Sequence, residues 1–447
     1  MDLLQTDTKR LYFKFLLPSM MSALVTSIYF FVDAIAVGQS EGALGTAAMA
    51  VTSPTYGIIA FLAVLCGVGG SVMMSMAKGS GEEEKGNACF TTAVVLMSIL
   101  TVALWIVFSL FREQIFTLFG ANAEVMPKTI EYGKWIIWFL PVFIFTPFMG
   151  AFLRNDGAPG LVMAAVVIGG GLNVFGDWFL VFPMKMGMTG AAVASVIGTS
   201  VQCVVLASHV FKKTCKLKLV RPRRIFRGFR KMLQIGIGAS ALDLGAVTIG
   251  MMINNQIARR GGTTELAVFG VMSTLMSLFF ALFAGVGQAV QPIVSTNYGA
   301  GKPERIRTIW RLSFATVLLL GALFTLIGEL FPIRITQFFM DATPAVLAAA
   351  PRIFRLFFPM FAFLGVTVLA AYYLQSVMEV RVSMAVGLSH SILVSGLILL
   401  VLPAVLGMDG VWLAMPVTEL IVGMIGTGYI VRRMRRKPTR RPQPPLC

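Results

Sequence analysis

Acidic side chains stand inside four of the long apolar stretches of this chain. They are Asp33, Asp177, Asp243 and Glu419. An ionised carboxylate at the centre of a bilayer costs at least about 2.5 to 3.5 kcal/mol, so an acid retained there marks a functional site by default. Two acids close together in low dielectric cannot both ionise cheaply, and one should hold a proton or share Na⁺ with neighbouring oxygens. These residues therefore indicate reversible binding of H⁺ or Na⁺.

The composition agrees with a membrane location for these acids. Of the 447 residues, 57% are hydrophobic and only 13% are charged, whereas soluble domains carry about 25% charged residues. This excludes a secreted disulfide scaffold, a nucleic-acid module and an ordinary cytosolic enzyme. An intramembrane enzyme would need several His or acids at metal or acid–base spacing. The chain has 2 His, far apart, and separated acids, so we expect that it is not an enzyme.

Polar breaks divide the chain into twelve apolar stretches, each long enough for the roughly 20 residues of one bilayer crossing. The stretches are 11–38, 46–77, 88–111, 130–153, 160–182, 189–211, 232–258, 266–297, 308–331, 350–376, 382–402 and 410–431. The sequence therefore predicts an all-α polytopic membrane protein with twelve transmembrane helices.

The basic residues set the orientation. The net charge of +17 is concentrated in two segments without acids, 212–231 with ten Lys and Arg, and 432–441 with seven. Such segments lie on the cytoplasmic side of a membrane, so we expect a multi-pass protein of the cell membrane with both termini cytoplasmic. The basic segments should also attract anionic lipid headgroups. We expect no nucleic acid as a partner.

The two halves of the chain repeat each other with an offset of about 220 residues. Gly67-Val-Gly69 returns as Gly285-Val-Gly287, and Pro183 returns as Pro403. Six helices per copy give both copies the same orientation, which predicts two six-helix lobes in a parallel internal repeat. The predicted domains are an amino-terminal lobe at 1–211, a cytoplasmic linker at 212–231, a carboxyl-terminal lobe at 232–431 and a basic, Pro-rich tail at 432–447.

This architecture is typical of an alternating-access transporter with a cavity between the lobes. A passive channel is the alternative from a different functional class, because channels and scaffolds can also arise by duplication. Five Cys without C-x-x-C spacing predict neither a disulfide framework nor a zinc site. We therefore expect no cofactor and no structural metal, and the only ion would be the coupling H⁺ or Na⁺.

Depth along the helices indicates which acids can meet. At 1.5 Å per residue, Asp33 lies about 30 Å from the cytoplasmic start of its helix, and Asp177 lies about 25 Å from the start of helix five. Asn173 precedes Asp177 by four residues and shares its helix face. Ser195 lies about 9 Å from the outer end of helix six. Asp33, Asn173, Asp177 and Ser195 are therefore the predicted ion-coupling residues.

A purely structural role is the alternative for this set. The same four side chains could bond to one another or to the backbone only to hold the bundle together, as polar groups often do in membrane proteins. We favour the ion-binding role, in which Na⁺ could bind transiently at Asp33, Asn173 and Asp177.

The second half lacks such a set. Asp33 maps onto Ile253 or Asn254, and Asp177 maps onto Leu397 or Ile398. The polar residues that we predict as a substrate site or secondary polar site are Asp243, Asn254, Gln288 and Tyr29. Asp243 could serve there as a counter-ion for the substrate or as a second proton site. His390 and Glu419 are each solitary in their segments, so an interhelical hydrogen bond is the expected role of each.

Several motifs resemble the multidrug and toxic compound extrusion (MATE) family. They run in order along nearly the whole chain: Pro18 followed by Phe31-Val-Asp33-Ala-Ile-Ala-Val-Gly38, Gly67-Val-Gly-Gly-Ser71, Phe152-Leu-Arg154-Asn-Asp-Gly157, Asn173 to Asp177, Gly190-Ala-Ala-Val-Ala194 and Gly287-Gln-Ala-Val-Gln-Pro292. The resemblance implies two six-helix lobes around a central cavity and export of cationic, lipophilic compounds in exchange for H⁺ or Na⁺.

The resemblance also implies roles for particular residues. In one branch of the family the coupling site is a helix-one Asp, a helix-five Asn and Asp, and a helix-six Thr. Asp33, Asn173 and Asp177 match the first three, while Ser195 replaces the Thr and leaves the ion preference open. Another branch uses acids on helices seven and ten. Asp243 lies on the matching helix seven, but helix ten has no acid before Glu379.

We therefore expect a secondary antiporter that works by alternating access. Its partners would be a small cationic or amphiphilic substrate and the lipid bilayer, and we expect a monomer. A lipid or glycolipid flippase of the same wider superfamily is the alternative. Such flippases tend to have fourteen helices and cationic residues in the cavity, whereas the cavity candidates here are acidic.

Overall fold

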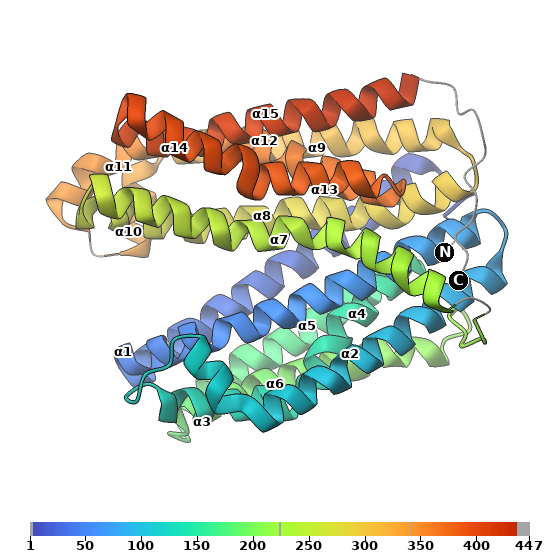
Figure 1. Ribbon diagram of the computed structural model, residues 1–447, viewed down its shortest axis with the longest axis horizontal. Helices are drawn as coiled ribbons and strands as arrows, with labels where there is room; N and C mark the ends of the chain where they lie inside the picture. Colours follow the sequence, from blue (N-terminus) through green and yellow to red (C-terminus); the bar gives the residue numbers. More distant parts are fainter. Residues whose placement is uncertain (1–2, 223–224, 341, 436–447) are drawn as a thin grey trace. The chain divides into compact units, whose positions relative to one another are not determined.

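The computed structural model describes residues 3–222, 225–340 and 342–435, without the side chains of 238–247 and 258 in the seventh helix. Within these ranges all regular structure is helical (Figure 1). The helices before the linker are α1 (Thr8–Gly79), α2 (Glu83–Leu118), α3 (Met126–Trp138), α4 (Leu140–Asn155), α5 (Pro159–Gly176), the π-helical turn η1 (Asp177–Val181), α6 (Gly187–Ala207) and the 3-10 turn η2 (Ser208–Phe211).

The helices after the linker also include long and short pieces. They are α7 (Ile225–Arg260), α8 (Thr263–Gly299), α9 (Pro303–Leu330), α10 (Pro332–Phe339), α11 (Pro344–Phe357), α12 (Met360–Ser376), α13 (Val380–Leu388), the π-helical turn η3 (Ser389–Leu393), α14 (Val394–Leu406) and α15 (Met408–Arg435).

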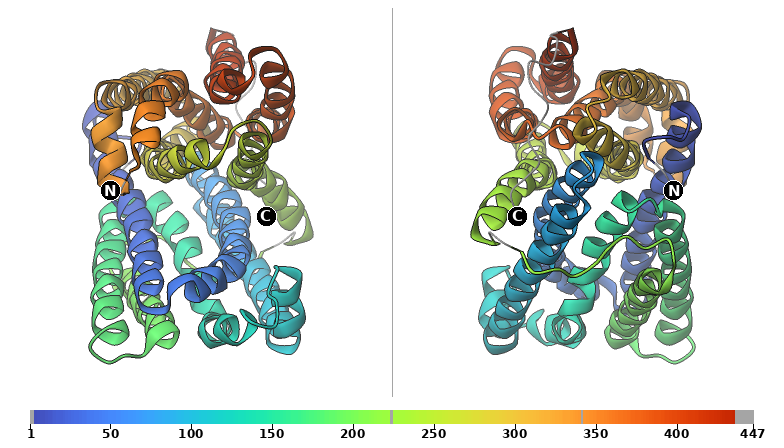
Figure 2. Two further views of the ribbon diagram at one scale, coloured as in Figure 1. Left: turned by 90° about the vertical axis from the view of Figure 1, so that its left-hand side faces the viewer. Right: turned by 90° about the vertical axis from the view of Figure 1, so that its right-hand side faces the viewer.

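The chain forms two compact units. Among the described residues, unit 1 holds 3–5 and 17–236, and unit 2 holds 6–16 and 237–435. Figure 2 shows the helices of each unit from their ends. The boundary between the units lies within α7, beyond the linker that the sequence predicts at 212–231. The predicted lobes at 1–211 and 232–431 remain predictions.

The first residues of α1 belong to unit 2. There, the Tyr12 hydroxyl donates a hydrogen bond to Thr316 Oγ1 at 2.9 Å, and Arg305 Nη2 donates to the Thr6 carbonyl oxygen at 2.7 Å. From Leu17 onward the same helix belongs to unit 1. Pro18 is the second residue after this change of unit. α1 therefore contributes to the core of both units.

The predicted all-α membrane class is confirmed. In the described part of the chain, eight helices are long and apolar enough to cross a membrane. Two bent pairs of helices could each form one further crossing, which would bring the number of crossings to ten. The bent pairs are α3 with α4, at 56°, and α11 with α12, at 42°.

The number of twelve crossings remains a prediction. α1 alone, with 72 residues, covers two of the predicted stretches and is interrupted at Gly42, whose φ of 63° and ψ of −146° are not helical. A positive φ is accessible to Gly because it lacks a Cβ. α7 (Ile225–Arg260) contains the predicted stretch 232–258, of which the side chains of 238–247 lie outside the description.

Prolines inside the helices leave backbone carbonyls without their usual donor, because Pro has no N–H. Pro403 in α14 frees the carbonyl of Leu399, which instead accepts a hydrogen bond from Gln256 Nε2 of α7 at 3.0 Å. Pro54 in α1 frees the carbonyl of Ala50, which accepts from Ser53 Oγ at 2.9 Å. In an apolar environment each freed carbonyl needs such a substitute, and these side chains provide it.

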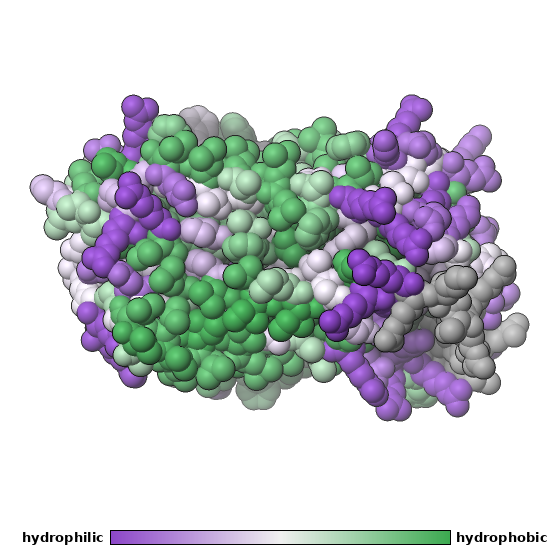
Figure 3. All heavy atoms as spheres, turned by 90° about the horizontal axis from the view of Figure 1, so that it is seen from above, coloured by the Kyte–Doolittle hydropathy of each residue, from purple (hydrophilic) through white to green (hydrophobic). Residues whose placement is uncertain are grey.

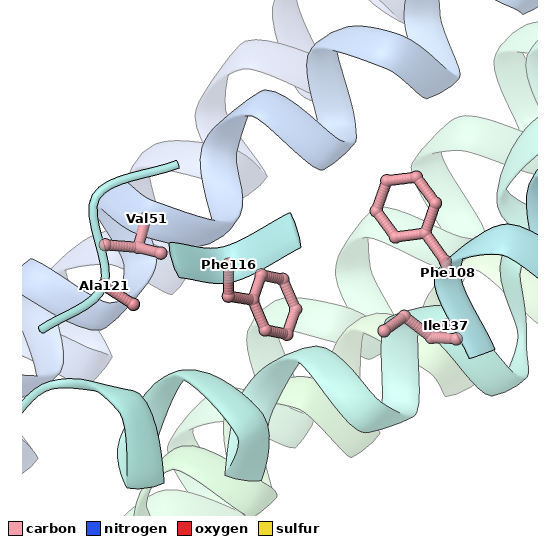
Figure 4. Close-up of a cluster of buried hydrophobic side chains, with 5 residues drawn as sticks. All are labelled: Val51, Phe108, Phe116, Ala121 and Ile137. Carbon is pink, nitrogen blue, oxygen red and sulfur yellow. The ribbon is translucent and has the colours of Figure 1, made fainter. Parts of the chain in front are cut away.

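A buried hydrophobic cluster joins the first three helices of unit 1. It contains Val51 of α1, Phe108 and Phe116 of α2, Ala121 of the following loop and Ile137 of α3 (Figure 4). The Phe116 ring lies against Gly133 of α3, where a Cβ would overlap it. This packing fixes α3 against α1 and α2 and so positions the side chains that α3 directs into the unit.

Hydrophobic side chains also cover much of the outer surface. On the face in Figure 3 they occupy the middle, while hydrophilic side chains gather at the two ends. Leu319, Leu323 and Leu326 of α9 are among the large exposed side chains. A surface of this kind is stable against lipid chains and not against water.

α5 and α6 approach each other closely at two glycines. A Cβ on Gly169 would overlap the Gly198 carbonyl oxygen and Gln202 Cγ, and a Cβ on Gly198 would lie 2.6 Å from the Gly169 carbonyl oxygen. Small residues at such contacts let two membrane helices pack backbone against backbone. This contact holds Asn173 of α5 opposite Ser195 of α6.

We expect Gly169→Ala to lower the free energy of unfolding by about 1 to 3 kcal/mol, because overpacking of a close contact costs that much. Gly171→Ala is the matched control, since a Cβ there would meet no atom within 4 Å. Thermal unfolding of both purified variants measures the difference. Equal melting temperatures would show that the close contact is not needed.

Candidate functional site

The four predicted ion-coupling residues all lie in unit 1 and are buried. Asp33 of α1 is 3% exposed, Asn173 of α5 is 2%, Asp177 at the start of η1 is 1% and Ser195 of α6 is 8%. Asn173 Nδ2 donates a hydrogen bond to Ser195 Oγ at 3.2 Å. Asp177 interacts electrostatically with Asp33, so the two carboxylates are neighbours. The structure thus brings together side chains from three helices.

Local helix geometry explains how one helix supplies two of these side chains. Asn173 and Asp177 are four residues apart and therefore share a face. The π-helical turn η1 begins at Asp177, and π turns widen a helix by one residue and frequently occur at functional sites. Immediately before it, Gly176 lies so close to Ala194 of α6 that a Cβ would be 2.9 Å from the Ala194 Cβ. This holds the face against α6.

Two tyrosines complete the site. The Tyr132 hydroxyl of α3 donates a hydrogen bond to Asp33 Oδ2 at 2.9 Å, and the Tyr56 hydroxyl of α1 lies 3.2 Å from that of Tyr132. Tyr132 is fully buried. Neither tyrosine is among the coupling residues that the sequence predicts. A signal was present, because Tyr132 lies two residues inside the outer end of the stretch 130–153, at the level assigned to Asp33 and Asp177.

Four oxygen atoms of the cluster have no hydrogen-bond partner among the described residues. They are Asp33 Oδ1, Asn173 Oδ1 and both carboxylate oxygens of Asp177. An ionised carboxylate can only accept hydrogen bonds, so two neighbouring carboxylates satisfy each other only when a proton lies between them. Oxygens of carboxylates and amides are also the ligands that hard cations prefer. The chemistry that fits this arrangement is binding of H⁺ or of a small monovalent cation.

An ionic cluster links three of the helices around the site, near the break of α1 at Gly42. Lys128 Nζ of α3 lies 2.9 Å from Glu41 Oε2 of α1 and 3.2 Å from Glu131 Oε2. The Thr189 hydroxyl of α6 donates to Glu131 Oε1 at 3.1 Å, and the Met188 backbone N–H donates to Glu41 Oε1 at 3.3 Å. These contacts connect α1, α3 and α6 beyond Asp33 and Ser195.

The structure divides the predicted substrate or secondary polar site between the two units. Tyr29 lies in unit 1, one turn of α1 before Asp33, and its ring packs against Gly170 of α5. Asn254 of α7 is exposed and Gln288 of α8 is half-buried, and both belong to unit 2. Asp243 lies in the part of α7 whose side chains are outside the description. This set therefore remains a prediction.

The interhelical role that we expect of His390 and Glu419 agrees with the structure, in which each side chain has the other as its partner. His390 Nδ1 lies 2.7 Å from Glu419 Oε1 in unit 2. The two residues are 29 positions apart in the sequence, on η3 and α15, which pack against each other. Each residue looks isolated within its own segment because its partner stands on another helix.

Comparison with known proteins places this chain in a family. The model of the MatE family matches it twice, at residues 18–179 and 239–401. The multidrug export protein MepA of Staphylococcus aureus is 24% identical over 314 residues, which are 69% of this chain and 68% of MepA. The probable multidrug resistance protein YoeA of Bacillus subtilis is 23% identical over 336 residues, 73% of this chain and 72% of YoeA.

A solved structure shows the same fold. It is an outward-facing multidrug resistance MATE family transporter of the MOP superfamily, which superposes with a TM-score of 0.89 over 97% of both chains at 20% identity. The two matches to the family model cover well over half of the sequence and include Asp33, Asn173 and Asp177. The chain therefore belongs to the MatE family and is a MATE family transporter.

Proposed function

We propose that this transporter is a secondary antiporter that exports cationic, lipophilic compounds in exchange for H⁺ or Na⁺ by alternating access. The coupling cation would bind at the cluster of Asp33, Asn173, Asp177 and Ser195. The observation that carries the proposal is the group of four buried oxygens without a hydrogen-bond partner in the described part of the chain. A bound proton or Na⁺ would supply the missing partner.

The energetics favour a site that is filled and emptied in a cycle. Two adjacent carboxylates in apolar surroundings repel each other, and a bound cation removes that repulsion. Tyr132 holds one oxygen of Asp33, so the carboxylate stays oriented while its other oxygen is open to the cation. Binding and release would change the packing of α1 against α5 and α6, the helices that carry the cluster.

The relatives support the export of drugs as the transport function. MepA is named a multidrug export protein and YoeA a probable multidrug resistance protein. In an exchange, one charge moving through 100 mV supplies about 2.3 kcal/mol, which sustains a concentration ratio of about fifty-fold for the exported compound. A buried acidic cluster in one unit is sufficient to receive that charge.

We expect Asp33→Asn and Asp177→Asn each to abolish gradient-driven export, because each removes one of the two carboxylates that hold the cation. Efflux of a cationic dye from proteoliposomes, under an imposed pH gradient or Na⁺ gradient, measures the effect and identifies the coupling ion. Glu113→Gln is the matched control, because Glu113 is an exposed acid on α2 outside the cluster.

Three results would contradict the proposal. The first is normal export by both Asp variants, which would remove the cluster from the mechanism. The second is dye movement that responds to neither gradient. The third is a steady electrical current far larger than an exchange cycle can produce, which would indicate a passive channel.

We expect Tyr132→Phe to slow coupled export about ten-fold or more, since a hydrogen bond to a charged group contributes about 1.5 to 3 kcal/mol. Tyr56→Phe should have a smaller effect, because Tyr56 contacts the hydroxyl of Tyr132 and Tyr132 would still donate to Asp33. Initial rates of dye efflux at one fixed gradient give the comparison. Equal rates for the wild type and Tyr132→Phe would mean that Asp33 needs no orienting donor.

A further inference from the structure

Unit 2 contains a buried acid and base in direct contact. His390 Nδ1 lies 2.7 Å from Glu419 Oε1, and the side chains are 5% and 0% exposed. His390 Nδ1 and both carboxylate oxygens of Glu419 make no hydrogen bond of regular geometry among the described residues, so the contact between the two side chains is a close approach of the two groups. Figure 1 shows α15, which carries Glu419, in the same group of helices as α13 and α14, which flank His390. The cluster in unit 1 does not involve this pair.

No other described charged group reaches the pair. α12 and α14, which pack against α15, carry no charged residue. Apart from Glu419, the charged residues of α11, α13 and α15 are paired elsewhere, exposed or at a helix end: Arg352 pairs with Asp409, Arg355 and Arg381 are exposed, and Arg432, Arg433 and Arg435 close α15. At 1.5 Å per residue, Glu419 is about 15 Å from Asp409 and about 20 Å from Arg432.

The surrounding neutral groups contact the pair only weakly. The Thr367 hydroxyl of α12 donates to the backbone carbonyl oxygen of Glu419 at 3.5 Å and not to its carboxylate. Thr418 Oγ1 and Ser395 Oγ are buried without a partner in the described part of the chain. Among the described side chains, which leave out 238–247 of α7 and with them Asp243, His390 and Glu419 therefore depend mainly on each other for charge compensation.

Charge balance fixes the number of protons that such a pair retains. With one proton, it is either imidazolium with carboxylate or imidazole with carboxylic acid, and both forms are neutral overall. Loss of that proton would leave an uncompensated carboxylate among apolar side chains, and gain of a second would leave an uncompensated imidazolium. The single-proton state is therefore favoured around neutral pH, and the pair releases its proton only when the pH is high enough to offset the cost of the uncompensated carboxylate.

The helix geometry at the pair repeats a feature of unit 1. His390 lies in the π-helical turn η3, and Asp177 begins the π-helical turn η1. Among the described residues these are the two π-helical segments. In each unit, then, a π turn presents a buried titratable side chain to an acid on a neighbouring helix, and π turns are frequent at functional sites.

We propose that His390 and Glu419 form a second cation-binding site of this transporter, located in unit 2 and specific for a proton. The proton comes from water and returns to water, and it is shared between Nδ1 and Oε1 while bound. Na⁺ is excluded because the pair offers one carboxylate and an imidazole, whereas the cluster in unit 1 offers several oxygens without partners.

Histidine NMR tests the proposal directly, because the chain has only 2 His. Protein labelled with ¹⁵N-histidine, carrying His209→Gln and reconstituted in lipid nanodiscs, reports His390 alone. We expect the ring ¹⁵N signals of His390 to show one titration between about pH 5 and about pH 10. This range includes the usual pKa of histidine and leaves room for a shift caused by the neighbouring Glu419. Glu419→Gln should lower the proton affinity at His390 at least ten-fold, because an opposite charge at this distance favours the protonated form.

Two controls separate this site from the rest of the molecule. Glu329→Gln, an exposed acid on α9, should leave the His390 titration unchanged. Asp33→Asn should also leave it unchanged, so the result does not depend on whether the unit 1 cluster drives export. Addition of Na⁺ at constant pH should not shift the His390 signals.

Three outcomes would overturn the proposal: His390 signals that are invariant with pH, an identical titration in Glu419→Gln, or a shift caused by Na⁺. If Glu419→Gln does not fold, the double variant His390→Gln/Glu419→Gln provides a second measurement. It leaves two amides that can bond to each other, and infrared difference spectra between acid and alkaline pH should then lose one carboxyl band relative to the wild type. Retention of every carboxyl band would also overturn the proposal.

Discussion

The structure depends on one constraint, the high free-energy cost of a polar group without a partner in an apolar environment. Most of the buried polar groups described here meet it within the protein. The Gln256 side chain donates to the Leu399 carbonyl oxygen, which Pro403 leaves without a backbone donor. The Ser53 hydroxyl donates in the same way to the carbonyl oxygen that Pro54 leaves free. The cluster of Asp33, Asn173 and Asp177 departs from this rule, because four of its oxygens have no partner among the described residues. Four such oxygens on neighbouring acids and an amide, unlike the single hydroxyls of Thr55 and Thr101 that also lack a partner, indicate a ligand that arrives and leaves.

Close helix packing keeps the unpaired oxygens of the cluster in place. Gly169 and Gly198 bring α5 and α6 into backbone contact, and the buried hydrophobic cluster around Phe116 fixes α3 against α1 and α2. Tyr132 of α3 can therefore hold Asp33 while Asn173 holds Ser195. The unpaired oxygens are thus surrounded by side chains in fixed positions. These side chains cannot easily move to form hydrogen bonds with the unpaired oxygens.

Much of the fold and part of the site were predictable because both follow from regular helix geometry. Apolar stretches of membrane length gave the helical class, and a constant rise per residue placed Asp33, Asp177 and Ser195 at one level. The same arithmetic could have included Tyr132, two residues inside the predicted stretch 130–153, but a tyrosine is uncharged and so is not marked as a functional residue by the cost of burying a charge. The contact of His390 with Glu419 was inaccessible in this way, since depth does not tell which faces of two helices meet.

By itself, the sequence determined the membrane class, the family and the identity of the buried acids, because these depend on composition, order and spacing along the chain. Only the tertiary structure decided which side chains touch. Rotation of each helix about its axis and the approach distance at its glycines are set by packing against several neighbours at once. That packing placed Tyr132 on Asp33 and His390 on Glu419, and it left the oxygens of Asp177 without a donor.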